Sequence, residues 1–191
     1  MSVYPKSIAA LLESVRCAGE SGSESSSGRA VRFECGGFVR VSLQIDKTAG
    51  AVVDARFGTS GCGYMAAAAE AACRRLVGKP LADLNGLESV EKALAAVLGS
   101  IPANRSGCVS AMMIALRDAF NEHRERRVEE FAGERALICT CFGISEDTVT
   151  ACIESIDPES VDQVSSACRA GSGCGACRML IQELIDVRSG A

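Results

Sequence analysis

The stretch Gly171-Ser172-Gly173-Cys174-Gly175-Ala176-Cys177 sets two cysteines in a glycine-rich run near the end of the sequence. An earlier pair, Cys139 and Cys141, is separated by one residue, so the four cysteines form one C-x-C and one C-x2-C spacing. Four thiolates are a closed set of soft ligands that suits zinc or an iron–sulfur cluster. Four cysteines are also the usual complement of a [2Fe–2S] centre.

The glycines around the second pair favour a cluster over zinc. A backbone without Cβ atoms can bring its N–H groups close to sulfide and thiolate, and these groups offset the negative charge. Cys177 also precedes a predicted helix over residues 178–187, and the N-terminal end of a helix favours anionic sulfur. The spacing leaves three interpretations: a [2Fe–2S] cluster, a zinc site, or four unliganded core cysteines, since buried free cysteine is common.

The segment from Leu137-Ile138-Cys139-Thr140-Cys141-Phe142-Gly143 to Gly173-Cys174-Gly175-Ala176-Cys177 resembles the bacterioferritin-associated ferredoxin (BFD) type of [2Fe–2S] domain. The resemblance covers residues 137–191 and implies a small all-helical domain with a permanent [2Fe–2S] centre. Its implied iron ligands are Cys139, Cys141, Cys174 and Cys177. Helices are predicted over residues 145–155, 160–170 and 176–187.

Length and composition indicate a cytoplasmic, soluble protein. The 191 residues suffice for one large domain or two small ones, and 48% of them are hydrophobic, so a core can form. The 11 cysteines are an odd number, and residues 1–17 lack the basic and apolar blocks of a signal peptide. We therefore expect reduced cysteines that serve as metal ligands. No apolar run approaches the roughly 18–20 residues that a membrane span needs, so no membrane partner is expected.

The negative charge is concentrated in the C-terminal part. Residues 137–191 contain three arginines and eight carboxylates, whereas the whole chain has a formal net charge of −4. A nucleic-acid partner is therefore not expected. The acidic surface is either an ordinary solvated one or a surface that steers a basic redox partner, such as an electron donor.

Hydrophobic periodicity predicts an α+β fold, with an N-terminal antiparallel sheet and packed helices. Residues 39–45 alternate apolar and polar side chains, as a half-buried strand does, and residues 51–57 are the predicted hairpin partner. The serine and glycine tract at residues 19–28 is predicted to be a loop. Helices are predicted over residues 5–17, 62–77, 87–98 and 106–127. The expected organisation is a scaffold-type domain over residues 1–128, a charged linker over 129–136 and the [2Fe–2S] domain over 137–191.

Three further cysteines lie beside glycines: Cys35 before Gly36-Gly37, Cys62 in Ser60-Gly61-Cys62-Gly63, and Cys108 after Gly107. Cys62 and Cys108 stand at predicted helix entrances, where the positive end of the helix lowers the pKa of a thiol. Three thiolates without a fourth protein ligand leave one coordination position open, which suits a site that exchanges its contents. The alternative is that each cysteine is a small buried residue.

The segments around these three cysteines resemble the U-type iron–sulfur scaffold family, which includes IscU and the N-terminal domain of NifU. The similarity covers residues 3–127 in order and spacing, and residues 52–66 form its second-cysteine segment. A scaffold domain followed by a ferredoxin-like domain is the NifU arrangement, here without the customary C-terminal carrier domain. The resemblance implies that Cys35, Cys62 and Cys108 bind iron in a transient [2Fe–2S] or [4Fe–4S] cluster.

The resemblance further implies an iron–sulfur cluster assembly scaffold rather than an enzyme. Sulfur would come from a cysteine desulfurase, and the finished cluster would pass to apo iron–sulfur proteins; a homodimer is expected. Two departures from the family bear on this expectation. The family usually has an aspartate where this chain has Gly37, and often a histidine where it has Gly107. Asn104, Arg105 or an external thiol are candidate substitutes.

Two other functions stay open: a ferredoxin-like electron carrier whose N-terminal domain only docks a partner, and a zinc-binding regulatory protein. Cys17, Cys73, Cys152 and Cys168 lie on predicted helical stretches without cysteine partners, and we expect them to serve in packing. His123, the only histidine, lies in a charge-rich helix end and is expected on its solvated surface. No acid–base or nucleophilic group of residues accompanies it, so no catalytic residue is predicted.

Overall fold

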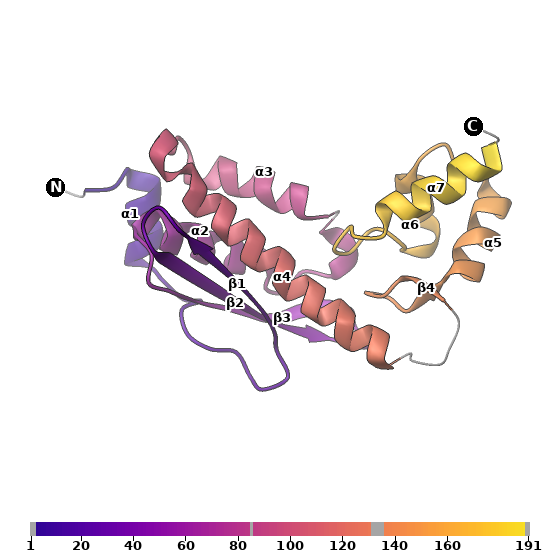
Figure 1. The fold of residues 1–191 in the computed structure, drawn as a ribbon, viewed down its shortest axis with the longest axis horizontal. Coiled ribbons are helices and arrows are strands. Elements are labelled where there is room, and N and C mark those ends of the chain that lie inside the picture. The colour runs from indigo at the N-terminus through magenta and orange to yellow at the C-terminus, as the bar shows by residue number, and fades with distance from the viewer. Residues whose placement is uncertain (1–2, 85, 131–135, 190–191) are drawn as a thin grey trace.

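The computed structural model describes residues 3–84, 86–130 and 136–189 (Figure 1). Its elements are, in chain order, α1 (Lys6–Glu13), β1 (Ser26–Arg32), β2 (Gly37–Asp46), β3 (Ala51–Thr59), α2 (Gly63–Leu76), η1 (Leu81–Asp83), α3 (Leu87–Leu98), η2 (Ala103–Arg105), α4 (Ser106–Glu130), β4 (Leu137–Cys139), β5 (Ile144–Ser145), α5 (Glu146–Ile156), α6 (Val161–Cys168) and α7 (Arg178–Ser189). We call the part up to residue 130 the N-terminal unit and residues 136–189 the C-terminal unit.

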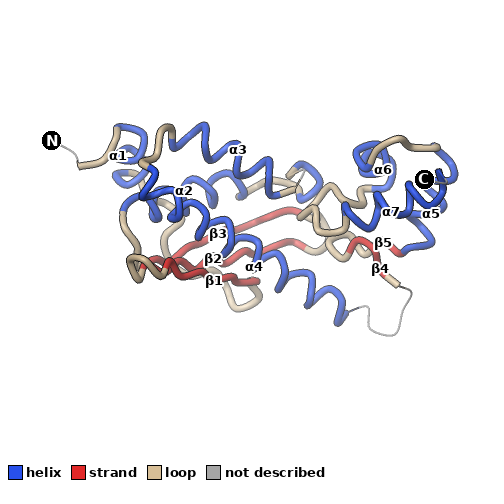
Figure 2. Tube along the Cα trace, turned by 45° about the horizontal axis from the view of Figure 1, so that its top comes forward, coloured by secondary structure: helices blue, strands red, loops and turns tan. Residues whose placement is uncertain are grey.

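The N-terminal unit is an antiparallel sheet of order β1-β2-β3 with helices on one side, as Figure 2 shows. On β2, the predicted alternation is confirmed: Val39, Val41 and Leu43 are buried. Helices α4 and α2 pack on the sheet and contact each other. Their buried apolar faces, including Met112 and Leu116 of α4, complete the core. The predicted α+β class is confirmed.

Strand β1 begins inside the stretch that the sequence assigned to a loop, so that prediction was wrong for residues 26–28. A Cβ atom at Gly28 would lie 2.0 Å from the carbonyl oxygen of Ala115 and 2.3 Å from the amide nitrogen of Ala119. The absent side chain therefore lets β1 lie directly against α4. The Ser27 N–H also donates a hydrogen bond to Glu122 Oε2. Contact with α4 thus stabilises β1 as a strand, although its sequence has no apolar periodicity.

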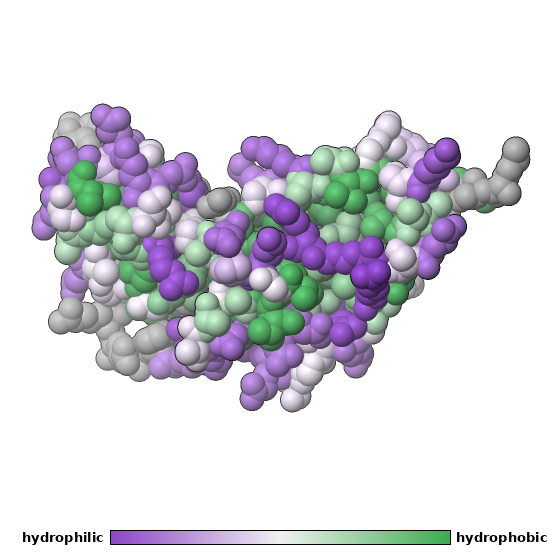
Figure 3. Space-filling view, turned by 180° about the vertical axis from the view of Figure 1, so that it is seen from behind, coloured by the Kyte–Doolittle hydropathy of each residue, from purple (hydrophilic) through white to green (hydrophobic). Residues whose placement is uncertain are grey.

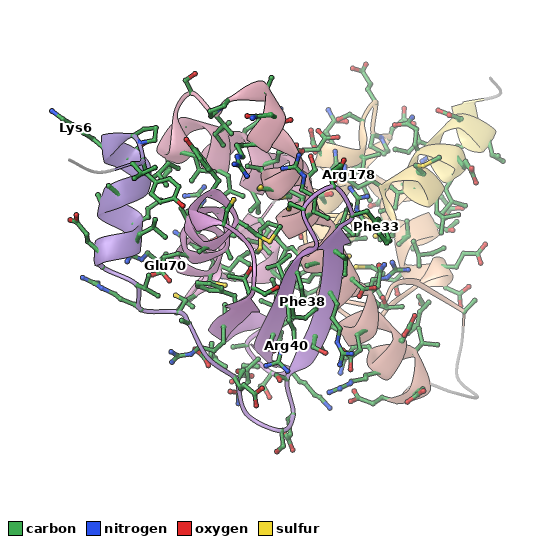
Figure 4. All side chains as sticks on the ribbon, turned by 60° about the vertical axis from the view of Figure 1, so that its left-hand side comes forward. Lys6, Phe33, Phe38, Arg40, Glu70 and Arg178 are labelled. Carbon is green, nitrogen blue, oxygen red and sulfur yellow. The ribbon has the colours of Figure 1, made fainter. Side chains whose placement is uncertain are left out.

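Glu70 is a fully buried carboxylate on the alanine-rich helix α2. It accepts hydrogen bonds from the backbone N–H groups of Arg16 at 2.9 Å and Cys17 at 3.0 Å, and it pairs with Arg74. Figure 4 shows Glu70 beside the segment that follows α1. The carboxylate ties this segment to α2, and its hydrogen bonds and ion pair offset the cost of burying a charge.

The C-terminal unit contains the three predicted helices, which pack through buried Val149, Val164 and Ile181. It is not purely helical, as the sequence had predicted, because β4 and β5 form a short antiparallel hairpin. Gly143 has φ +65° in the turn between these strands, a conformation that glycine adopts without strain. The strands are too short to leave a periodic signal in the sequence.

Helix α4 is longer than predicted and buries its histidine. Its final residues, Glu129 and Glu130, fall in the predicted linker over 129–136, of which residues 131–135 lie outside the described residues. His123 is only 6% exposed, so the expectation of a solvated side chain was wrong. It continues the buried stripe of Met112, Leu116 and Ala119, all at helical spacing on one face. Burial lowers the pKa of His123 to about 4.

The two units meet where the second half of α4 passes the cysteine loops of the C-terminal unit (Figure 1). The Gly86 N–H donates to the Gly173 carbonyl at 3.2 Å, and Arg124 Nε donates to Thr140 Oγ1 at 3.3 Å. A cleft of about 1110 Å³ lies between the units and is lined by residues of both.

On the face opposite to that of Figure 1, apolar residues form small patches among polar ones, as Figure 3 shows. Within the described ranges 3–84, 86–130 and 136–189, no helix combines the length and the apolar character that a membrane span requires.

Candidate metal centres

The four cysteines of the C-terminal unit lie around one small cavity, which we call the quartet cavity. Cys139 ends β4, Cys141 follows in the turn, and Cys174 and Cys177 come from the loop before α7. The Sγ atoms of Cys141 and Cys174 are 3.3 Å apart, and the thiol of Cys139 exchanges hydrogen bonds with those of Cys141 and Cys177. The fold thus brings together the two cysteine pairs that are far apart in the sequence.

The quartet cavity favours negative charge on two of its four sulfur atoms, those of Cys139 and Cys174. Hydrogen bonds from the thiols of Cys141 and Cys177, helped by backbone N–H groups of Gly171 and Phe142, lower the pKa of Cys139 to about 3. A hydrogen bond from Cys141 lowers the pKa of Cys174 to about 7. The partners in these bonds, Cys141 and Cys177, have raised pKa values because they keep the shared protons.

This donor set fits a [2Fe–2S] centre. Four soft ligands converge, and backbone N–H groups of a glycine-rich loop point at the sulfur atoms. Gly173 packs against Cys141, where a Cβ atom would lie 3.3 Å from the Cβ of that cysteine. Among the residues that the structure describes, no group of three or more His, Cys, Asp or Glu side chains is arranged to hold one metal ion.

A second pair of thiols lies in the N-terminal unit. Cys62 immediately precedes α2, Cys108 lies in the first turn of α4, and their Sγ atoms are 3.6 Å apart. Burial opposes ionisation of Cys62, but the backbone N–H groups of Met65 and Tyr64 and the Cys108 thiol lower its pKa. Burial is the main cause that raises the pKa of Cys108. Within this pair, Cys62 is therefore the thiol that ionises more readily.

Cys35 stands apart from this pair, on the exposed turn between β1 and β2. Its Sγ lies over Gly37, where a Cβ atom would be 3.2 Å from the sulfur and 3.3 Å from the Cα of Gly61. Cys35 is thus close to the loop that carries Cys62. The structure brings Cys62 and Cys108 together and leaves the third predicted cysteine at the solvent edge beside them.

Arg32 is a residue of this site that the sequence did not single out. Its Nη1 donates a hydrogen bond to Cys108 Sγ at 3.2 Å, its Nη2 donates to the Asn104 carbonyl at 2.9 Å, and its Nε pairs with Glu34 at 3.2 Å. A Cβ atom at Gly107 would lie 3.0 Å from Arg32 Nε, so the guanidinium fills the space beside this glycine. The position where the family often has a histidine is thus next to a fixed positive charge.

The remaining cysteines fall into two pairs. Cys17 and Cys73 are buried, as the packing role predicts, and burial raises the pKa of each. Cys152 on α5 exchanges a hydrogen bond with Cys168 on α6, and both are partly buried. These pairs lie outside the two candidate centres.

The two candidate centres lie beside different parts of α4. Cys108 is in the first turn of this helix, and Arg124, which lines the quartet cavity, is 16 residues further along. At a rise of 1.5 Å per residue the two positions are about 24 Å apart along the helix axis. The centres are therefore separate sites that share no ligand.

Comparison with known proteins matches the two units with two families. The family described as the NifU-like N terminal domain matches residues 3–130, and that described as the BFD-like [2Fe-2S] binding domain matches residues 137–187. The chain is 31% identical over 173 residues to the nitrogen fixation protein NifU of Trichormus azollae, and equally to that of Nostoc sp.. Each alignment covers 89% of this chain and 57% of the relative, so the chain spans little more than half the length of these relatives.

A solved structure with a similar outline is that of a nitrogen-fixing NifU-like protein (N-terminal) from Brucella abortus. The superposition has a TM-score of 0.41 and 16% sequence identity, and it covers 83% of this chain and 96% of that chain.

Proposed function

We propose that this chain, which belongs to the family of NifU-like N-terminal domains, is an iron–sulfur cluster assembly scaffold. It would bind and transfer clusters and would not act as an enzyme. One observation carries the proposal: the chain has two cysteine sites of opposite character. One is a quartet around a small cavity with backbone N–H donors, and the other is a pair of a partly exposed thiol, Cys62, and a buried one, Cys108, beside the exposed thiol of Cys35.

The quartet would hold a permanent [2Fe–2S] centre through Cys139, Cys141, Cys174 and Cys177. Three of the four, Cys139, Cys141 and Cys177, are buried and shield such a centre from solvent, and the N–H groups of the loop offset its negative charge. When bound there, the centre supplies one-electron redox chemistry. The protein's own contribution is a closed ligand set that keeps the centre in place.

The transient cluster would form on Cys35, Cys62 and Cys108, as [2Fe–2S] or [4Fe–4S]. Three ligands leave a coordination position open, so a cluster can leave this site more easily than the quartet. Cys62 and Cys108 supply a preformed edge, and Cys35 would close onto it from the β1–β2 turn. Iron is cargo here, captured by a thiolate at the start of a helix.

Sulfur would be delivered as a persulfide by a cysteine desulfurase, and Cys35 is the most accessible acceptor of the three. Its thiolate would attack the outer sulfur of the donor persulfide, the S–S bond of the donor would break, and the desulfurase cysteine would leave as thiolate. The transferred sulfur must gain two electrons to become sulfide. An electron donor is therefore a required partner, together with the apo-proteins that receive the cluster.

The proposal also includes the domain boundaries, the location in the cell and the oligomeric state. We propose a scaffold domain over residues 1–128, a linker over 129–136 and a [2Fe–2S] domain over 137–191; the two family matches, over residues 3–130 and 137–187, support this division into two domains. We propose a cytoplasmic location, where cysteines stay reduced, and a homodimer.

The proposal is tested by reconstitution of the purified protein without oxygen, with desulfurase, cysteine and ferrous iron. A scaffold gains a second, chelator-labile cluster and passes it to an apo-ferredoxin. Cys62→Ala should abolish this gain while the permanent centre stays. Cys73→Ala, a buried cysteine away from both centres, is the matched control and should gain the cluster.

Three outcomes separate the candidate functions. A second cluster that depends on Cys62 supports the scaffold. A permanent centre without any second cluster contradicts the scaffold and favours an electron carrier. A protein that holds only zinc contradicts both.

A further inference from the structure

Arg124 is a residue of the N-terminal unit that lines the quartet cavity of the C-terminal unit. Its Nε donates to Thr140 Oγ1 at 3.3 Å, and Thr140 separates Cys139 from Cys141 in the sequence. On its own helix, its Nη1 donates to Asn121 Oδ1 at 3.4 Å. The guanidinium is thus held between α4 and the first cysteine pair.

Arg124 places a positive charge beside the cysteines of the other unit. Among the described residues that line the quartet cavity, it is the one basic side chain. The C-terminal unit is strongly acidic, with eight carboxylates and three arginines in residues 137–191. The basic side chain that lines the quartet cavity therefore comes from outside the unit, whereas Arg169 of the unit itself stacks on Phe142 and Arg178 pairs with Asp162.

We infer that Arg124 is a positioning residue through which the N-terminal unit raises the reduction potential of the C-terminal centre and senses its redox state. The inference rests on the proposed [2Fe–2S] centre. One-electron reduction adds a negative charge among four thiolates, and a cation beside the cavity stabilises the more negative state. Removing the cation should therefore make the centre harder to reduce.

The coupling must also act in the reverse direction. If the Arg124 contact favours the reduced centre, reduction strengthens the contact between the units by the same factor. The cleft between the units shares Cys174, Gly175 and Ala176 with the quartet cavity. Reduction should thus hold this cleft in the described arrangement, and oxidation should loosen it.

The test is a redox titration of the full-length holoprotein, followed by electron paramagnetic resonance of the reduced centre. Arg124→Gln should reduce the ratio of reduced to oxidised centre about tenfold at a fixed ambient potential, which for a one-electron couple is about 59 mV. Arg124→Lys keeps the charge and should retain most of the wild-type potential. Arg117→Gln removes the same charge from α4 about two turns away and should leave the potential unchanged.

Each outcome bears on the inference. Equal reduction potentials of the centre in the wild type and in Arg124→Gln would overturn it. A shift in Arg117→Gln as large as that in Arg124→Gln would overturn it too. Loss of the centre from Arg124→Gln but not from Arg124→Lys supports a required cation, whereas loss from both means that Arg124 builds the site and does not tune it. A wild-type protein without any [2Fe–2S] signal contradicts the proposed function itself.

Discussion

The guanidinium of Arg32 lies 3.2 Å from the sulfur of Cys108, so a strand residue supplies a fixed positive charge to a thiol at the start of α4. This charge stabilises a thiolate and attracts anionic sulfur species. It also repels a ferrous ion, which must displace the guanidinium before it can bind Cys108. We therefore predict that the Arg32–Cys108 contact determines whether sulfur or iron enters the proposed cluster site first.

Substitution of Arg32 by alanine should strengthen the binding of ferrous iron in the absence of sulfide. The positive charge repels a divalent ion about twice as strongly as it repels the proton that competes for the same thiolate. We expect a roughly tenfold gain in affinity by anaerobic calorimetric titration of the protein with its quartet loaded.

Two variants serve as controls for this charge effect. Arg32→Lys keeps the charge and should bind iron as the wild type does. Arg29→Ala removes the same charge from an exposed position on β1, and it should also leave the affinity unchanged. Unchanged or weaker iron binding by Arg32→Ala would refute the role of this contact.

Substitution of Gly28 by alanine should destabilise the N-terminal unit by about 3 kcal/mol. The new methyl group would overlap backbone atoms of α4 at Ala115 and Ala119, which cannot move aside as a flexible side chain can. Gly58→Ala on β3 is the matched control, because a Cβ there has no heavy atom within 4 Å. Urea denaturation measures both variants, and equal stability for the two would argue against the packing of β1 on α4.

Glu70→Gln should cost on the order of 3 kcal/mol of stability, since the neutral amide leaves Arg74 without its buried counter-charge and weakens two backbone hydrogen bonds. Chemical denaturation gives the loss directly. Glu13→Gln, an exposed carboxylate at the end of α1, should change stability by less than about 0.5 kcal/mol. A Glu70 variant as stable as the Glu13 variant would be inconsistent with the burial described.

His123 should make the protein less stable as the pH falls. The unfolded chain takes up a proton on this histidine near pH 6.5, whereas the folded chain does so only at about pH 4. Between these values the unfolded state binds more protons, so stability is present above pH 6.5 and is lost as the pH falls toward 4. By pH 5 the loss is about 2 kcal/mol.

The measurement for His123 is urea denaturation at pH 7 and pH 5, compared with His123→Leu. The leucine variant lacks the titrating group and should lose about 2 kcal/mol less between the two pH values. Identical pH dependence in both proteins would mean that His123 ionises freely in the folded state.

Patterns with a local physical cause could be predicted from the sequence. The strand over residues 39–45 follows from alternating side chains, and α3 was predicted with its observed bounds because its apolar spacing and flanking glycines define both ends. The cysteine pairs at 139–141 and 174–177 were found by spacing alone. Their role as ligands stays a prediction, as does that of Cys35, Cys62 and Cys108.

Features that depend on distant contacts could not be predicted. Strand β1 forms because Gly28 lets it lie against α4, and residues 26–28 have no periodicity that predicts this contact. Arg32 and Arg124 looked like ordinary charged residues, because the thiol and the hydroxyl that they contact are 76 and 16 residues away. The burial of His123 could have been predicted, since this residue continues the apolar stripe of α4. The charged residues around it in the sequence instead indicated a solvated position.

The most direct test of the account is the iron and acid-labile sulfide content of the protein isolated without oxygen. The wild type should carry about two iron atoms and two sulfides per chain in its permanent centre. Cys139→Ser should lose this centre, and anaerobic reconstitution should add a second, labile cluster to the wild type. A colourless wild-type preparation that contains only zinc, and that stays colourless after it is supplied with iron and sulfide, would contradict the account.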